Sequence, residues 1–176
     1  TSGLRVIESI NGWLHSQTQR SEARFNKDKG YVCTLSAAIF KSSTAHLFHV
    51  GDSRIYRLRD DGLEQLTNDH RLWLSKEKSY LSRAMGIDLS VEVDYQTVAL
   101  KQGDYFLLCT DGVYEYCDTE DVLNTLKAHE DDLDKAAESL INLALEKGSD
   151  DNLTLQFVRI DQLPSIESST LQQQVD

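Results

Sequence analysis

The stretch "LLCTDGVYE", residues 107–115, is an apolar run that ends at an acidic residue followed by glycine. The run has the composition of a buried strand, and Asp-Gly is among the commonest turn dipeptides. A surface turn is therefore the simplest interpretation of Asp111 and Gly112. The alternative is that the strand delivers Asp111 to a functional site, and that alternative needs matching features elsewhere in the chain.

The bulk composition indicates one acidic globular domain. The chain has 176 residues, 40% of them hydrophobic and 27% charged, which suffices for one well-buried core. Its formal net charge of -11 argues against a nucleic-acid surface and against binding to anionic lipid. No apolar run approaches the length of a membrane span, and we expect a cytoplasmic protein. The three cysteines are an odd number, which does not favour a disulfide framework.

Periodicity predicts a helix, several strands, two helices and a final strand. Apolar residues in the segment 4–14, among them Ile7, Ile10 and Trp13, have the spacing of one helix face. We expect a helical turn in 80–86 and further helices within 119–147. Strands are expected in 31–40, 44–51, 53–67, 91–100, 103–110 and 152–160. Since strands joined by tight turns pair antiparallel and grouped helices must cover a sheet, this order predicts a layered α+β domain.

Two further acids repeat the arrangement of Asp111 at strand boundaries. Asp52 lies in "HVGDSRIYRL" and Asp151 in "KGSDDNLTLQF". Such positions can converge on one rim of a packed sheet, where unpaired carboxylates would repel one another or bind a cation. A ligand set made only of oxygens selects Mg²⁺ or Mn²⁺ over zinc. From spacing alone, an ordinary turn is the favoured interpretation for any one of the three acids, and only the three taken together suggest a metal site.

Six segments occur in a characteristic order along the chain: "GYVCTLSAAIF", "HVGDSRIYRL", "LTNDHR", "YLSRAMG", "GDYFLLCTDGVYE" and "SDDNLTLQFVRI". With these segments the chain resembles the metal-dependent protein phosphatases of the PP2C family. The resemblance runs from about Leu4 to Ile160, and it implies a four-layer αββα sandwich of two antiparallel sheets flanked by helices. We therefore expect one domain over residues 1–160 and a linker or tail over 161–176.

The resemblance also implies a site and a reaction. In that family the acids corresponding to Asp111 and Asp151 hold a pair of Mg²⁺ or Mn²⁺ ions, and the acid corresponding to Asp52 belongs to a third, weaker metal site. Gly112 would let main chain and water approach the acid closely, and Asn152 would support the ligands with hydrogen bonds. The implied reaction is hydrolysis of phosphoserine or phosphothreonine in proteins by a metal-activated water.

Other reactive side chains are interpreted as structural. Cys109 and Cys117 flank the acidic site, but neither lies in a phosphate-cradling loop that would activate a thiol. We expect Cys33 and Cys109 to behave as buried hydrophobes, because both lie in apolar runs. His70 could donate a proton to a leaving group, but a structural hydrogen-bonding role is favoured. Arg54 is expected to pair with a local carboxylate.

The sequence departs from the family pattern in two places. Nothing matches the family's N-terminal phosphate-binding arginine or the Asp-Gly turn whose acid bridges both metals. We therefore expect an N-terminally incomplete domain with impaired activity. The loop "LWLSKEKS" is short, as in bacterial proteins that join a phosphatase to a kinase-like domain, so a fused or cognate kinase is a further expectation. A catalytically inactive PP2C-like regulatory or binding module, and a plain acidic calcium-binding domain, remain open alternatives.

Overall fold

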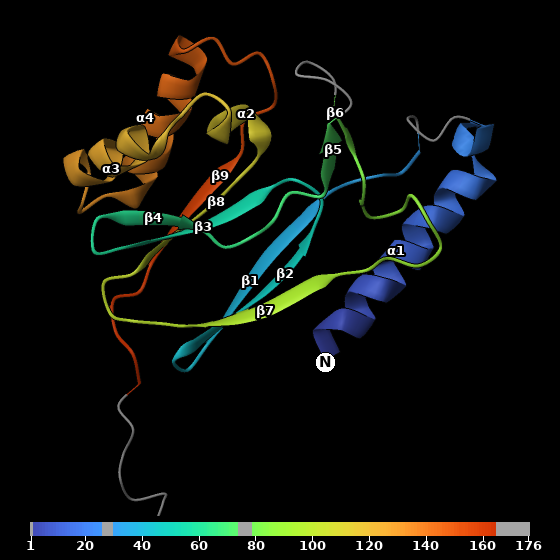
Figure 1. Cartoon of the computed structure of the whole chain (residues 1–176), viewed down its shortest axis with the longest axis horizontal. Helices are drawn as coiled ribbons and strands as arrows, with labels where there is room; N and C mark the ends of the chain where they lie inside the picture. The colour runs from blue at the N-terminus through green and yellow to red at the C-terminus, as the bar shows by residue number, and fades with distance from the viewer. Residues whose placement is uncertain (1, 26–29, 74–78, 165–176) are drawn as a thin grey trace, which may run out of the picture.

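The computed structural model describes residues 2–25, 30–73 and 79–164. Two antiparallel sheets pack face to face, and helices cover their outer faces (Figure 1). The predicted α+β fold with four αββα layers is therefore confirmed. Among the described helices, none has the length and apolar content needed to cross a membrane.

The strands form two main sheets and one small one. The first sheet has the order β1-β2-β7 and consists of β1 (Leu35–Lys41), β2 (Thr44–Val50) and β7 (Asp94–Ala99). The second sheet has the order β4-β3-β8-β9 and consists of β4 (Gly62–Gln65), β3 (Arg54–Arg59), β8 (Tyr105–Cys109) and β9 (Leu155–Arg159). The small sheet pairs β5 (Arg71–Trp73) with β6 (Ser79–Leu81).

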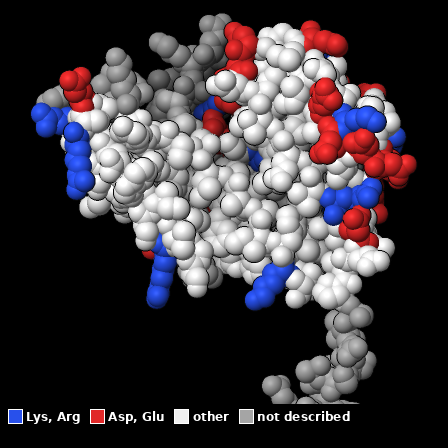
Figure 2. Space-filling view, turned by 180° about the vertical axis from the view of Figure 1, so that it is seen from behind, with Lys and Arg blue, Asp and Glu red and all other residues white. Residues whose placement is uncertain are grey.

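The helices lie on opposite sides of the sheet pair (Figure 1). On the β1-β2-β7 side lies α1 (Ser2–Arg20), which is followed by the 3-10 helix η1 (Glu22–Phe25). On the other side lie α2 (Asp111–Tyr114), α3 (Thr119–Ala128) and α4 (Leu133–Glu146). Figure 2 shows charged side chains crowded along the edge formed by α3 and α4, while most of the remaining face is uncharged.

Each pair of adjacent layers encloses its own apolar core. Between the sheets, Leu47 of β2 packs in one cluster with Ile55 of β3 and Phe106 of β8. Their neighbours point the other way: Phe48 joins the cluster beneath α1, and Leu107 joins the cluster beneath α4. Successive side chains of a strand face opposite sides of the sheet. Because both of its sides are covered, β8 is apolar throughout, whereas β2 includes Thr44, His46 and His49 among its apolar residues.

The helix α1 is rotated relative to the predicted apolar face. Ile7 is buried, but Ile10 and Trp13 are 47% and 60% exposed, so the prediction that both face the core was wrong. Asn11 is fully buried instead; its side chain donates to two main-chain carbonyl oxygens at 3.0 and 3.1 Å and accepts from the amide of Gly86 at 2.8 Å. These directional bonds set the rotation, because a buried amide must find partners.

The segment 80–86 is not a helical turn as predicted. After β6, Met85 forms a two-way main-chain bridge with Cys33, at N–O distances of 3.2 and 2.9 Å. Gly86 follows with a φ of +86°, and a Cβ atom there would lie 2.1 Å from the carbonyl oxygen of Tyr31. Pairing with a distant segment therefore overrides the local helical pattern. The same bridge leaves Cys33 exposed, contrary to the expectation that it is buried.

The remaining helix predictions agree with the structure, apart from segments that it does not describe. Asp118 and Asp121 form a capping box at the start of α3, so the acids predicted in its first turn satisfy unpaired helix amides. The short loop 72–79 and the tail 161–176 lie largely outside the described residues, at 74–78 and 165–176.

Candidate metal centre

The sheet register brings the three predicted acids to one end of the second sheet. Both β3 and β9 run antiparallel to β8, and Cys109 pairs with Arg54 on one side and Leu155 on the other. Asp111 lies just beyond the end of β8, while Asp52 and Asp151 lie just before the starts of β3 and β9. An antiparallel strand begins where its neighbour ends. The three acids therefore share a rim.

Asp52 and Asp111 converge on Arg71. Nη2 of Arg71 lies 2.6 Å from Oδ2 of Asp52 and 2.8 Å from Oδ2 of Asp111. Nη1 of Arg71 lies 2.8 Å from Oε1 of Glu115, one turn further along from Asp111. The side chains of Asp52 and Arg71 are only 11% and 13% exposed, so this charge cluster is largely shielded from water. Burial opposes the charged form of Arg71, but the hydrogen bonds that its guanidinium donates to Asp52 and Glu115 outweigh burial and raise the guanidinium pKa.

Asp151 lies beside this cluster and is exposed. Its Oδ1 accepts a 2.7 Å hydrogen bond from the amide of Asn152. The carbonyl oxygen of Asn152 in turn accepts from Oγ1 of Thr110, at 3.2 Å, and packs against Gly112. The turn of Asp151 is thus joined to the turn of Asp111 through main-chain contacts of Asn152. Within residues 2–25, 30–73 and 79–164, no three His, Cys, Asp or Glu side chains form a group able to hold a metal.

His70 holds the turn that carries Asp52. Its amide donates to the carbonyl oxygen of Gly51 at 2.7 Å, and its Nδ1 accepts from the amide of Gly51 at 3.0 Å. Its Nε2 lies 3.0 Å from Oδ2 of Asp94, whose other oxygen accepts from Arg83 at 2.7 Å. Nδ1 must be unprotonated to accept, so Nε2 carries the proton that His70 donates to Asp94. Both ring nitrogens of His70 are engaged, which favours the structural role over proton donation.

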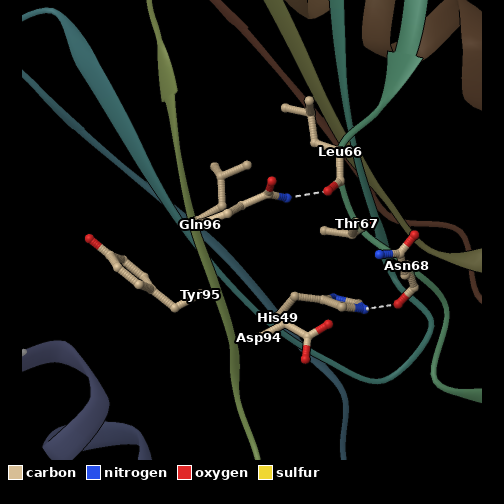
Figure 3. Close-up of a pocket in the computed structure, with 8 residues that line it drawn as sticks. His49, Leu66, Thr67, Asn68, Asp94, Tyr95 and Gln96 are labelled. Atoms are coloured by element: carbon tan, nitrogen blue, oxygen red, sulfur yellow. Dashed lines mark hydrogen bonds between the residues drawn. The ribbon is translucent and has the colours of Figure 1, made fainter.

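A cavity of about 330 Å³ adjoins the contact between His70 and Asp94 (Figure 3). It opens between β7 and the segment that follows β4, and Asp94 is part of its wall. In Figure 3, His49 and Gln96 reach across toward the main chain of Asn68 and Leu66, to which they hydrogen-bond. The cavity contains none of the three predicted acids, and it is therefore separate from the candidate metal centre.

The donor set of the rim fits a hard divalent cation in part. The oxygens of Asp52 and Asp111 already share one cationic nitrogen, which shows that this position attracts positive charge. Asp111 and Asp151 contribute further carboxylate oxygens, the ligand type that Mg²⁺ and Mn²⁺ prefer.

Residues 4–156 match the family model described as protein phosphatase 2C. The chain belongs to the protein phosphatase 2C family. The PP2C match spans every layer of the sandwich and all three acids of the rim.

Named relatives and solved structures agree with this assignment. The serine/threonine phosphatase stp of Listeria welshimeri is 33% identical over 183 residues, which cover 90% of this chain and 71% of that protein. PppA, a key regulatory component of T6SS in Pseudomonas aeruginosa, has a TM-score of 0.75 and 27% identity over 87% of this chain and 66% of that one. The catalytic domain of the phosphatase PstP, solved in complex with two manganese ions, has a TM-score of 0.70 and 28% identity, covering 86% of this chain and 67% of that one.

These relatives make the chain a protein phosphatase of the 2C type. It spans about two thirds of the length of the two solved PP2C structures. The predicted family is confirmed. The metal-ligating roles of Asp111, Asp151 and Asp52, and the supporting roles of Gly112 and Asn152, stay predictions.

The cysteines of this PP2C chain are not activated. Burial raises the pKa of the Cys109 thiol to about 12, and it also raises the pKa of Cys117. The Cys109 side chain lies in the core beneath α4, while Cys117 Sγ contacts the carbonyl oxygen of Leu140 at 3.8 Å. A thiol in such surroundings is a poor nucleophile.

No sequence pattern predicted a role for Arg71, Glu115 or Tyr114. The acidic partners of Arg71 are 19, 40 and 44 positions away along the chain, so no local pattern signals them. The hydroxyl of Tyr114 donates to the carbonyl oxygen of Asp52 at 2.9 Å. The ring of Tyr114 lies 3.6 Å from the guanidinium of Arg54, which also forms the predicted local pair, with Asp69.

Proposed function

We propose that this domain hydrolyses phosphoserine and phosphothreonine in proteins with the help of divalent cations. Asp111 and Asp151 would hold these ions, and Asp52 would contribute to an additional, weaker site. The observation that carries the proposal is the common rim of the three acids, where two of them already bind one cationic group. Two manganese ions in the PstP catalytic domain support the choice of cation.

The protein's own residues position this donor set. Gly112 allows the strand-ending turn of Asp111 to approach the carbonyl oxygen of Asn152. Asn152 in turn orients the Asp151 carboxylate through its amide. His70 hydrogen-bonds to both the amide and the carbonyl oxygen of Gly51 and so fixes the turn that carries Asp52.

When bound, the divalent cations supply an activated water at neutral pH and stabilise the growing negative charge of the phosphoryl group. Asp111 is the first residue of α2, and 30% of its side chain remains accessible to solvent. Arg71 offsets the mutual repulsion of Asp52, Asp111 and Glu115. Cys109 and Cys117, the two thiols nearest Asp111 in sequence, are poor nucleophiles, because burial raises the pKa of both.

The test is Mn²⁺-stimulated hydrolysis of a phosphothreonine peptide by the intact protein that carries this chain. Asp111→Asn keeps the shape of the side chain but removes its charge, and we expect kcat/KM to fall by about 100-fold or more. Asp161→Asn is the matched control, because Asp161 is an exposed acid far from the rim that pairs with Arg159. Equal activity of Asp111→Asn and the control would remove Asp111 from the mechanism.

A catalytically inactive regulatory module is the second candidate. The observation in its favour is that Arg71, a protein group, already neutralises acids of the rim, while the described residues contain no complete group of three metal-ligating side chains. Binding of a phosphoprotein or a cognate kinase by the intact protein, without any Mn²⁺-dependent hydrolysis, would favour the module over the enzyme.

A further inference from the structure

A guanidinium lies between Asp52 and Asp111, two acids that the family resemblance links to metal binding. The same nitrogen, Nη2 of Arg71, lies within 2.8 Å of a carboxylate oxygen from each acid. Nε of Arg71 adds a second bond to Oδ2 of Asp52, at 2.9 Å. Glu115 contacts the other end of the guanidinium, at 2.8 Å. Arg71 is therefore fixed by three acids from two separate segments of the chain.

The geometry does not allow a second cation to use the same oxygens. A divalent ion shared by Oδ2 of Asp52 and Oδ2 of Asp111 would need the position between these two oxygens, and Nη2 of Arg71 already holds that position with short hydrogen bonds to both. Two cations at contact distance would also repel strongly in a shielded site, and the side chain of Arg71 is only 13% exposed. Either Arg71 or a metal ion can occupy the space between these acids.

We propose that Arg71 is a resident counter-cation that competes with divalent metal for the Asp52–Asp111 pair. A metal ion binds to this pair only when the guanidinium leaves it, so the resting protein is stable without metal at this position. This inference rests on the proposed metal-dependent function for its physiological meaning, but its test measures metal binding directly. It predicts weaker metal binding by the natural protein than by a variant that lacks the guanidinium.

The first test uses Arg71→Gln in the whole chain and measures Mn²⁺ affinity by calorimetry and thermal unfolding with and without Mn²⁺. We expect the Kd for Mn²⁺ at the Asp52–Asp111 pair to fall by about tenfold or more, because breaking a shielded ion pair is costly. Without metal, the variant should melt at a lower temperature than the natural protein, because three acids lose their counter-charge. Mn²⁺ should restore most of that loss. Adding Asp52→Asn to Arg71→Gln should abolish the gain in affinity.

Arg59→Gln is the matched control. Arg59 also forms a two-pronged pair with a buried acid, Asp104, with both distances at 2.7 Å. Its loss should lower the melting temperature, but Mn²⁺ should restore no more than it does for the natural protein. Equal Mn²⁺ affinity of Arg71→Gln and the natural protein would overturn the proposal. An equal recovery of melting temperature on Mn²⁺ addition for Arg59→Gln and Arg71→Gln would overturn it as well.

The second test needs no variant and so does not depend on the folding of Arg71→Gln. The Nε–H signals of Arg71 and Arg59 are followed by NMR while the diamagnetic ion Mg²⁺ is added to the natural chain. The Arg71 signal should shift toward that of a solvated guanidinium, and the Arg59 signal should stay in place. An Arg71 signal that keeps its position at saturating Mg²⁺ would contradict competition.

Both tests separate this inference from the proposed function. Tighter Mn²⁺ binding by Arg71→Gln, together with an intact protein that never hydrolyses a phosphothreonine peptide, would support the counter-cation and reject the enzyme. An active, Mn²⁺-dependent protein whose metal affinity is unchanged by Arg71→Gln would support the enzyme and reject the counter-cation.

Discussion

A Cβ atom on Gly112 would lie 2.8 Å from the carbonyl oxygen of Asn152, closer than side-chain carbons approach such an atom. Gly112 follows Asp111, and Asn152 follows Asp151. The absence of a side chain at residue 112 therefore lets the turns of two predicted metal ligands touch.

Gly112→Ala should destabilise the chain and separate these two turns. The contact is with main chain, which cannot rotate away, so we expect a loss of about 1–3 kcal/mol in the free energy of unfolding. Metal affinity should also fall. Urea unfolding and Mn²⁺ calorimetry measure the two effects.

Gly12→Ala is the control for this substitution and should have the opposite sign. Gly12 lies within α1, with no atom inside 4 Å of an added Cβ, so alanine should stabilise the chain by about 0.5–1 kcal/mol. Equal effects of the two substitutions would show that the Gly112–Asn152 contact has no structural importance.

Asp94→Asn should weaken the support of the Asp52 turn. Asp94 accepts from His70 on one oxygen and from Arg83 on the other, and an amide can accept on only one side. We expect a loss of about 1–3 kcal/mol in unfolding free energy. Asp61→Asn changes an exposed acid paired with Lys127 and should cost less than about 0.5 kcal/mol. Chemical denaturation of both variants would refute this role of Asp94 if their losses were equal.

Asp104 should make the stability of the chain sensitive to acid. Burial opposes ionisation of Asp104, but hydrogen bonds from Arg59 and from the amide of Lys101 prevail and lower its pKa. A lowered folded-state pKa adds stability above the unfolded value of about 3.9, and this stability is lost as the pH falls through the folded value. Asp104→Asn should therefore cost on the order of 3 kcal/mol at pH 7, because Arg59 loses its buried partner.

The cost of Asp104→Asn should begin to shrink as the pH falls below about 4, where the unfolded chain binds a proton at Asp104, and should shrink further until the pH passes the lowered folded-state pKa. Unfolding curves of the two proteins at a series of pH values measure this difference. A difference that stays constant down to the lowest pH would mean that folding does not lower the pKa of Asp104.

Alkylation at pH 8 should distinguish the cysteines. Desolvation raises the pKa of all three thiols, but Cys33 is exposed whereas Cys109 and Cys117 are buried. In the native state we expect iodoacetamide to label Cys33 first and to spare the activity of the intact protein. Mass spectrometry locates the label, and unfolding should make all three thiols reactive. Rapid native labelling of Cys109 would contradict its assignment to the core.

Local patterns predicted the layers of the fold better than the orientation of individual elements. The strand β8 was predictable because both of its faces are buried, which requires apolar residues throughout, and β2 was predictable from its period-two alternation. The helix α1 was located by its spacing, yet its rotation depends on hydrogen bonds between Asn11 and a segment more than 70 residues away. The bridge between Cys33 and Met85 likewise depends on a distant partner.

The sequence by itself determined the order of strands and helices, the acidic residue at each strand end and the family of the chain, because all of these are local patterns of residue type. Only the tertiary structure decided that Asp52 and Asp111 meet on Arg71 and that Asp151 joins them through Asn152. Side-chain contacts between distant segments follow from sheet register and packing, and neither is written in the spacing of residues along one segment.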